Sequence, residues 1–155
     1  MKAKHGNVPG AARTGAPRIP ATRKGPASTA YPEHPTHGDV TAGFRTHAVA
    51  EVAQRFGISP AAMAERIGVS RSTFHRKQKE DARLTGHESD ALARHAGLLS
   101  QATAVFDGDG EAARQWLNCP QIGLGNAIPL EFAKTTFGFR GVEKLLTRID
   151  RGVYA

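Results

Sequence analysis

The chain of 155 residues has a single cysteine, Cys119, so it cannot form an intramolecular disulfide. A lone thiol is typical of a protein from a reducing cytoplasm. The sequence has no run of apolar residues long enough to span a bilayer. Its N-terminus carries Lys2 and Lys4 but lacks the apolar segment of a secretory signal. We therefore expect a cytoplasmic protein without a membrane partner.

The sequence also lacks the residue patterns of an enzyme or a metalloprotein. Its seven histidines do not follow a metal-ligand spacing, and Cys119 precedes a proline with no base beside it in the sequence. The segment 107–111 is similar to the start of a calcium loop, but Asn118 stands where the bidentate glutamate is required. The segment 123–125 lacks the third glycine of a dinucleotide-binding loop. The sequence therefore predicts a protein that is not an enzyme, with no cofactor and no metal.

The positive charge of the chain is concentrated near its N-terminus. Of the formal net charge of +7, residues 1–38 carry +5, residues 39–106 carry +2, and residues 107–155 are neutral. Residues 1–38 also hold six of the nine prolines and few apolar side chains, too few to offset the entropy cost of ordering. We expect residues 1–40 to form a disordered basic arm, which is either a nucleic-acid contact or simply a solvated tail.

Apolar residues at helical spacing predict order from about Thr41 onward. Val49, Val52, Ala53 and Phe56 fall at i, i+3, i+4 and i+7, the pattern of an amphipathic helix. Ser59-Pro60 predicts the capped start of the next helix, which buries Met63, Ala64 and Ile67 and stops at Gly68. Ser70 then caps a helix over 71–79.

The rest of the chain also predicts helices. Thr85 and Glu88 form a capping box that opens a long helix through Phe106, and Asp107-Gly-Asp-Gly110 ends it. A short helix through Trp116, a turn that starts at Pro129, and a last helix with Val142, Leu145, Leu146 and Ile149 follow. No segment alternates with period two, so the fold class is all-α.

Two of these helices have the pattern of a helix-turn-helix, which reads DNA by placing its second helix in the major groove. Ala64 and Gly68 allow the two helices to meet at a tight angle, and Val69 and Phe74 can fill that angle from the second helix. The predicted DNA-binding residues are polar positions of the second helix, namely Arg71, Ser72, Thr73, His75, Arg76, Lys77 and Lys79. The alternative is a generic corner between two helices. Lys77 favours it, since such helices commonly bury an aliphatic residue there.

A spaced set of motifs covers residues 58–155. The motifs are Arg83-Leu84-Thr85 with Glu88-Ser89-Asp90, the segment 112–117, Gly123-Leu124-Gly125, Pro129-Leu130, Val142-Glu143, Leu145-Leu146, Arg148-Ile149 and Gly152-Val153-Tyr154. Together these motifs resemble the Xre/MbcA/ParS family of type II antitoxins. Two positions depart from the family pattern. Ile128 replaces a hydroxyl residue before Pro129, and the last helix begins Phe137-Gly138-Phe139, where small or polar residues are common.

The resemblance implies a partner and a mechanism. Members of the family bind an ADP-ribosyltransferase-like, NAD-consuming toxin of the RES or ParT type and cover its NAD cleft with their C-terminal segment. As homodimers they also bind operator DNA and repress their own operon, and they form higher-order complexes with the toxin. The toxin-binding residues that we carry over are Leu124, Pro129, Leu130, Phe137, Phe139, Arg148, Arg151, Gly152, Val153, Tyr154 and Ala155.

We thus expect three regions in the chain. They are the basic arm 1–40, a helix-turn-helix domain for DNA binding and dimerisation at 41–106, and a small helical toxin-binding module at 107–155. The alternative function is a plain helix-turn-helix transcription regulator whose C-terminal module only dimerises.

Overall fold

The computed structural model describes residues 31–32 and 34–153, so the predictions for residues 1–30 and for Tyr154 and Ala155 lie outside it. Within the described residues the fold is helical and contains no strand beyond two isolated bridges. The elements in chain order are α1 (His37–Ala42), α2 (His47–Phe56), α3 (Pro60–Arg66), α4 (Arg71–Lys79), α5 (Gly86–Val105), α6 (Gly110–Asn118), the 3-10 helix η1 (Ile122–Leu124), α7 (Pro129–Phe132) and α8 (Thr136–Asp150). The all-α prediction is confirmed.

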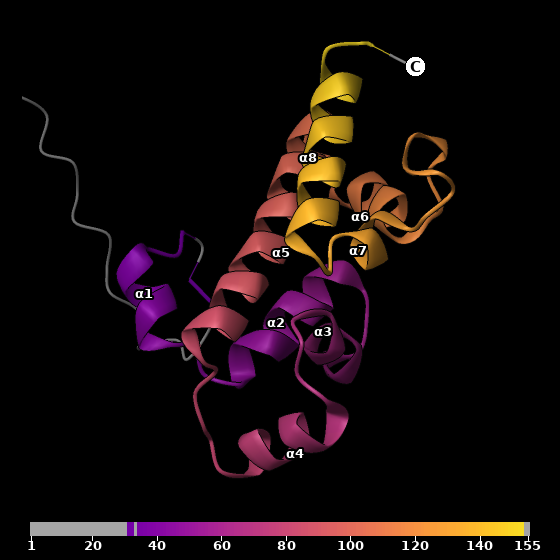
Figure 1. The fold of residues 1–155 in the computed structure, drawn as a ribbon. Coiled ribbons are helices and arrows are strands. Elements are labelled where there is room, and N and C mark those ends of the chain that lie inside the picture. The colour runs from indigo at the N-terminus through magenta and orange to yellow at the C-terminus, as the bar shows by residue number, and fades with distance from the viewer. Residues whose placement is uncertain (1–30, 33, 154–155) are drawn as a thin grey trace, which may run out of the picture.

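The long helix α5 is the axis of the molecule (Figure 1). Helices α1 to α4 gather around its N-terminal end, α6 and α8 pack against it toward its C-terminal end, and α7 packs on α6 and α8 (Figure 1). Helix α4 therefore lies at one end of the molecule, and the C-terminus of α8 lies at the other. Leu92, Leu98 and Ala102 of α5 are fully or almost fully buried and join the two groups of helices in one apolar core.

Residues 31–40, except the undescribed residue 33, are more structured than the sequence predicted. Tyr31 is buried against Phe44, with ring centroids 5.1 Å apart, and its backbone N–H donates to Oε2 of Glu51 at 2.8 Å. Helix α1 then begins at His37 after a capping box formed by Thr36 and Asp39. The prediction of a disordered arm up to residue 40 is therefore wrong for this segment, because composition alone did not reveal that Tyr31 reaches the core.

Polar contacts hold the two groups of helices together. Arg66 of α3 forms an ion pair with Glu131 of α7, and Asn118 of α6 donates from Nδ2 to the carbonyl of Phe56 at 3.3 Å. His95 lies in the same region, 2% exposed, with its Nδ1 2.8 Å from the carbonyl oxygen of Ala91. Burial lowers the pKa of His95 and keeps its ring neutral. The domain boundary that the sequence predicted at residue 106 lies directly after the end of α5. The segments on either side of it nevertheless share one apolar core.

Helix α8 approaches α7 so closely that one position admits only glycine. A Cβ on Gly138 would lie 1.8 Å from the carbonyl oxygen of Phe132 and 2.8 Å from its carbonyl carbon. Thr135 caps the same turn by accepting a hydrogen bond on Oγ1 from the Gly138 N–H at 3.0 Å. In the Phe137-Gly138-Phe139 sequence near the start of α8, the middle residue must therefore be glycine for α8 to pack against α7.

We expect Gly138→Ala to lower the free energy of unfolding by about 3 kcal/mol, because the backbones of α7 and α8 must separate. Gly97→Ala in α5 is the matched control. Its Cβ meets nothing within 4 Å, so it should be neutral or stabilise by up to about 1 kcal/mol. Urea denaturation of both variants checks this, and equal stabilities would contradict the packing argument.

Candidate nucleic-acid and protein interfaces

Helices α3 and α4 form the helix-turn-helix that the sequence predicted. Ser59 caps α3 through its Oγ, which accepts from the N–H of Ala62 at 3.2 Å. Ala64 is fully buried at the crossing, and its carbonyl accepts from the Val69 N–H at 2.9 Å. Val69 and Phe74, both 2% exposed, fill the angle between the helices. The small residue, the turn and the two apolar plugs have the positions that this motif requires.

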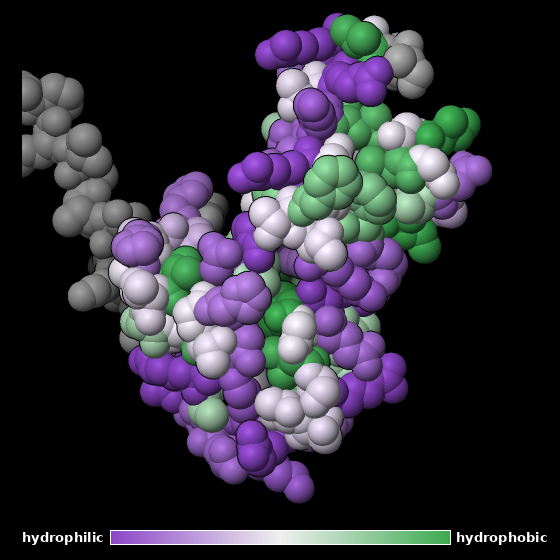
Figure 2. Space-filling model, in the orientation of Figure 1, coloured by the Kyte–Doolittle hydropathy of each residue, from purple (hydrophilic) through white to green (hydrophobic). Residues whose placement is uncertain are grey.

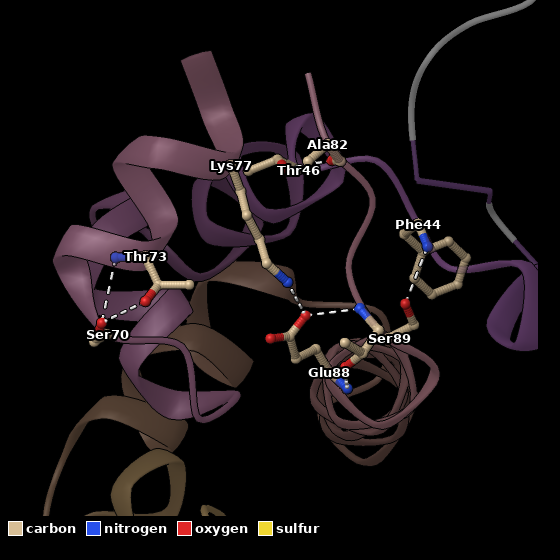
Figure 3. Close-up of polar contacts among 9 residues, drawn as sticks. Phe44, Thr46, Ser70, Thr73, Lys77, Ala82, Glu88 and Ser89 are labelled. Atoms are coloured by element: carbon tan, nitrogen blue, oxygen red, sulfur yellow. Dashed lines mark hydrogen bonds and ion pairs between the residues drawn. The ribbon is translucent and has the colours of Figure 1, made fainter. Parts of the chain in front are cut away.

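Helix α4 presents a polar face at the end of the molecule, and this region is largely hydrophilic in the space-filling view (Figure 2). The cap of α4 is Ser70, whose Oγ accepts from the Thr73 N–H at 3.3 Å and donates to Thr73 Oγ1 at 2.9 Å (Figure 3). Of the predicted DNA-binding residues, those exposed to solvent are Arg71, Ser72, His75, Arg76 and Lys79. Thr73 is half-buried. Arg71 remains exposed but its Nε lies 2.7 Å from a carboxylate oxygen of Glu65 in α3.

Lys77 does not belong to this face, and its prediction as a DNA contact is corrected. Its Nζ lies 2.5 Å from Oε2 of Glu88 at the start of α5, and the two side chains are only 14% and 16% exposed (Figure 3). The same Glu88 oxygen accepts from the Thr85 N–H at 2.7 Å and so completes the capping box of α5. Lys77 points inward because it pairs with Glu88, which lies in the first turn of α5.

The charge state of Glu88 follows from these contacts. Burial by itself would raise its pKa, but the hydrogen bond from Lys77, the Thr85 N–H and the Lys77 charge together hold the pKa below its ordinary value. The carboxylate is therefore ionised at neutral pH and ties α4 to α5.

The connection between α4 and α5 is also held to α2. Thr46 donates to the Ala82 carbonyl from its N–H at 3.2 Å and from its hydroxyl at 2.6 Å (Figure 3). The hydroxyl of Ser89, which is fully buried, accepts from the Phe44 N–H at 3.0 Å (Figure 3). The polar contacts in Figure 3 thus hold α4 and the loop after it to α5 and to the start of α2.

A groove with apolar walls lies at the opposite end of the molecule. It is formed by four elements, and its apolar lining residues are Phe106, Trp116, Ile122, Leu145, Ile149 and Val153. The rings of Phe106 and Trp116 are tilted against each other with centroids 6.3 Å apart. Ile122 is 88% exposed and Val153 is 53% exposed. Figure 2 shows hydrophobic side chains gathered beside α8 and over the α6 and η1 region. An exposed apolar surface of this kind is typical of a protein-binding site.

The loop that carries Ile122 is held in a fixed shape. Gln121 pairs with Ala127 across the loop, with an N–H to carbonyl distance of 3.0 Å. The side-chain amide of Gln121 donates from Nε2 to the Trp116 carbonyl at 3.0 Å. Ile122 is therefore presented to solvent by an ordered loop.

The chain leaves α8 through a turn that returns it toward the groove. Gly152 has a φ of +68°, a left-handed conformation that favours glycine. Its N–H donates to the Ile149 carbonyl at 2.9 Å, and the Val153 N–H donates to the Arg148 carbonyl at 2.9 Å. This pair of bonds is the Schellman motif. It brings Val153 to the lining of the groove.

The predicted toxin-binding residues are distributed over three environments. Those exposed to solvent are Phe137, Arg148, Arg151, Gly152 and Val153. Leu124 and Phe139 are half-buried against the core, and the Arg94 guanidinium lies 5.7 Å from the Phe139 ring centroid. Pro129 and Leu130 are buried, so their prediction as partner contacts is corrected. Leu130 is fully buried because α7 turns its apolar side into the shared core.

Sequence reasoning missed much of the groove. Trp116, Ile122, Leu145 and Ile149 line the groove but were not among the predicted toxin contacts. These residues meet only after α5, α6, η1 and α8 have packed, so no local spacing in the sequence reveals them.

The described residues contain no group of three or more His, Cys, Asp or Glu side chains arranged to hold a metal ion. Among the described helices, none combines the length and the apolar character that crossing a membrane demands.

Comparisons with known proteins agree with this division of surfaces. Residues 36–97 match the family model of the antitoxin Xre-like helix-turn-helix domain. Residues 101–152 match that of the antitoxin Xre/MbcA/ParS C-terminal toxin-binding domain. A protein named Antitoxin Xre from Photorhabdus laumondii is 30% identical over 86 residues, which is 56% of this chain and 58% of that protein. The chain thus matches little more than half the length of this relative.

We expect Glu88→Gln to lower the free energy of unfolding by about 2 kcal/mol at pH 7, because the bond between Lys77 and a charged carboxylate is lost. A carboxyl with a lowered pKa stabilises the fold above its unfolded pKa, and this contribution is lost as the pH falls through the folded pKa. The difference between wild type and variant should therefore shrink below the ordinary pKa of 4.5.

Urea denaturation across this pH range measures the difference. The control is Glu80→Gln, since Glu80 is exposed and has no ion pair within the described residues. A difference between wild type and Glu88→Gln that stays constant from neutral to acid pH would show that the Glu88 charge does not stabilise α4.

Proposed function

Because the chain belongs to the Xre/MbcA/ParS family of antitoxins, we propose that it neutralises a toxin with its C-terminal domain and represses its own operon with α4. In this proposal the chain acts in the cytoplasm, by binding the toxin and the operator DNA and not by catalysis. The observation that carries the toxin part is the exposed apolar groove between α6, η1 and α8, which lies within the match to the toxin-binding domain.

The proposed toxin is ADP-ribosyltransferase-like and consumes NAD, of the RES or ParT type. The family resemblance of the C-terminal motifs supports this toxin class. In this proposal residues 151–155 cover the NAD cleft of the toxin, while the groove holds the toxin surface beside it. The turn at Gly152 supports the role of the tail, since it fixes the direction in which the chain leaves α8. Tyr154 supplies an aromatic anchor of the kind that dominates protein interfaces.

The proposed DNA function rests on the polar face of α4. Arg76 and Lys79 are exposed and have no ion-pair partner within the described residues, so they are free to contact base edges or phosphates. Helix-turn-helix repressors read paired half-sites as dimers, so we propose a homodimer on operator DNA and a higher-order complex with the toxin.

The toxin proposal predicts a change in cellular NAD. Expression of the adjacent reading frame alone should deplete NAD, and the full chain should restore it. The chain without residues 151–155 should not, because the tail that covers the cleft is gone. The measurements are NAD content and growth, with the amount of truncated chain checked by immunoblot.

Other outcomes distinguish the alternatives. Full rescue by the truncated chain would contradict the role of the tail while leaving toxin binding intact. A harmless neighbour would favour a plain transcription regulator whose C-terminal module only dimerises. Rescue of growth without any loss of NAD would indicate a toxin of different chemistry.

The DNA proposal predicts that Arg76→Ala weakens binding to the chain's own promoter by about 1 to 3 kcal/mol if Arg76 pairs with a base. Lys79→Ala should weaken binding to all DNA sequences by a similar factor. It should also reduce the slope of log affinity against log salt concentration by about one. Arg114→Ala removes a charge from α6 that is paired with Glu111, outside α4, and should have no effect. Fluorescence anisotropy at several salt concentrations gives the affinities. Unchanged binding by both α4 variants would mean that α4 does not contact DNA.

A further inference from the structure

Helix α8 and the residue that caps its C-terminus carry a row of four exposed cations. Arg140, Lys144, Arg148 and Arg151 are all exposed, and we call them the basic stripe. They follow each other at intervals of four, four and three residues, which places them on one face of a helix. The stripe extends along roughly 16 Å of the helix axis. Figure 2 shows strongly hydrophilic side chains projecting along the upper part of α8.

The stripe is unusual because its four side chains form no ion pair or hydrogen bond with the residues that the structure describes. Within the described part of the chain, the other cations outside α4 are all engaged. Arg55 lies 5.6 Å from the Tyr31 ring centroid, and Arg83 donates to the Gly43 carbonyl at 2.7 Å. The cations in ion pairs are Arg45, Arg66, Arg71, Lys77, Arg94, Arg114 and Lys134.

The cations without such a partner within the described residues therefore occupy two places, Arg76 and Lys79 on α4 and the stripe on α8. Like charges four residues apart destabilise a helix, so the stripe has a cost to the fold. Residues 107–155 have no net charge, so the stripe is not the result of a generally basic domain. An arrangement that costs stability and has no partner among residues 31–32 and 34–153 indicates an external partner.

A large aromatic side chain stands beside the stripe. Phe137, one turn before Arg140, is 83% exposed. Phe137, Arg140, Gly141 and Lys144 line a hollow together with Gln101 of α5. Glu143 is the one acidic residue in that lining and is half-buried at its edge. The surface therefore combines positive charge with an exposed ring, which is the composition of a protein contact with electrostatic guidance.

The position of the stripe decides which partner it fits. Helix α4 and the C-terminal part of α8 lie at opposite ends of the molecule, so the stripe does not extend the polar face of α4 (Figure 1). It lies within residues 101–152 and on the same helix as Leu145 and Ile149 of the groove. The stripe is thus continuous with the surface proposed to hold the toxin.

We propose that the basic stripe docks onto an acidic surface of the toxin, which also has an apolar recess for Phe137. This inference rests on the proposed function and adds the chemistry of the partner surface. The unpaired cations attract the acidic surface at long range and orient the encounter, while the groove supplies most of the contact area. Ionic steering of this kind raises the association rate more than it slows dissociation.

The test compares two variants that each lose two positive charges. Arg140→Gln with Lys144→Gln removes half of the stripe, and Arg45→Gln with Arg55→Gln is the matched control in the other group of helices. Binding to the protein from the adjacent reading frame is measured by surface plasmon resonance at about 0.05 M and about 0.5 M NaCl. Thermal unfolding verifies that both variants are folded.

We expect the stripe variant to bind about tenfold more weakly at low salt, mainly through slower association, and to approach wild type at high salt. The control should stay within about twofold of wild type at both salt concentrations. Phe137→Ala should weaken binding about tenfold at both, because burial of a ring depends little on salt.

The other outcomes overturn one proposal or both. If wild type binds and the stripe variant binds equally well at low salt, the stripe is not a toxin contact, and the proposed function stands. If the stripe variant instead loses affinity for promoter DNA or for vesicles with anionic lipid, the stripe serves nucleic acid or membrane. If wild type does not bind the neighbour at all, the proposed function itself fails.

Discussion

The packing of α5 between two groups of helices is the constraint on which the rest of the structure depends. Its buried residues belong to one core shared by the helix-turn-helix and the C-terminal helices. At its start Glu88 holds Lys77 of α4, and directly after its end Phe106 forms a wall of the groove. A helix of 20 residues is about 30 Å long, so it fixes the two surfaces at a set distance. A shift of the helices at either surface must therefore be accommodated by the apolar contacts of this shared core.

This arrangement bears directly on how the proposed activities combine. Helix α4 and the C-terminal part of α8 lie at opposite ends of the molecule, so a toxin bound there leaves α4 open in the single chain (Figure 1). The two surfaces also differ in character. The α4 face is polar and has two cations without an ion-pair partner in the described part of the chain, whereas the α8 region combines apolar walls, an exposed ring and four such cations. Each surface thus fits a partner of different chemistry.

Most of the fold was predictable because its signals are local. Ser59, Ser70 and Thr85 cap the helices that the sequence predicted, and Val49, Val52 and Phe56 are buried as their spacing indicated. The errors concern contacts between residues distant in the sequence. Tyr31 reaches the core, Lys77 pairs with Glu88, and Leu130 turns inward, and none of these follows from helical spacing. The groove was missed for the same reason, since four separate elements build it.

The central claim is that DNA and toxin occupy opposite ends of one rigid chain. Amide hydrogen exchange of the full chain, alone and with each partner, tests it most directly. The account predicts that the toxin slows exchange around η1 and along α8 without changing α4, and that promoter DNA slows exchange in α4 without changing α8. Slower exchange in α4 on toxin binding, or no change along α8, would contradict the claim.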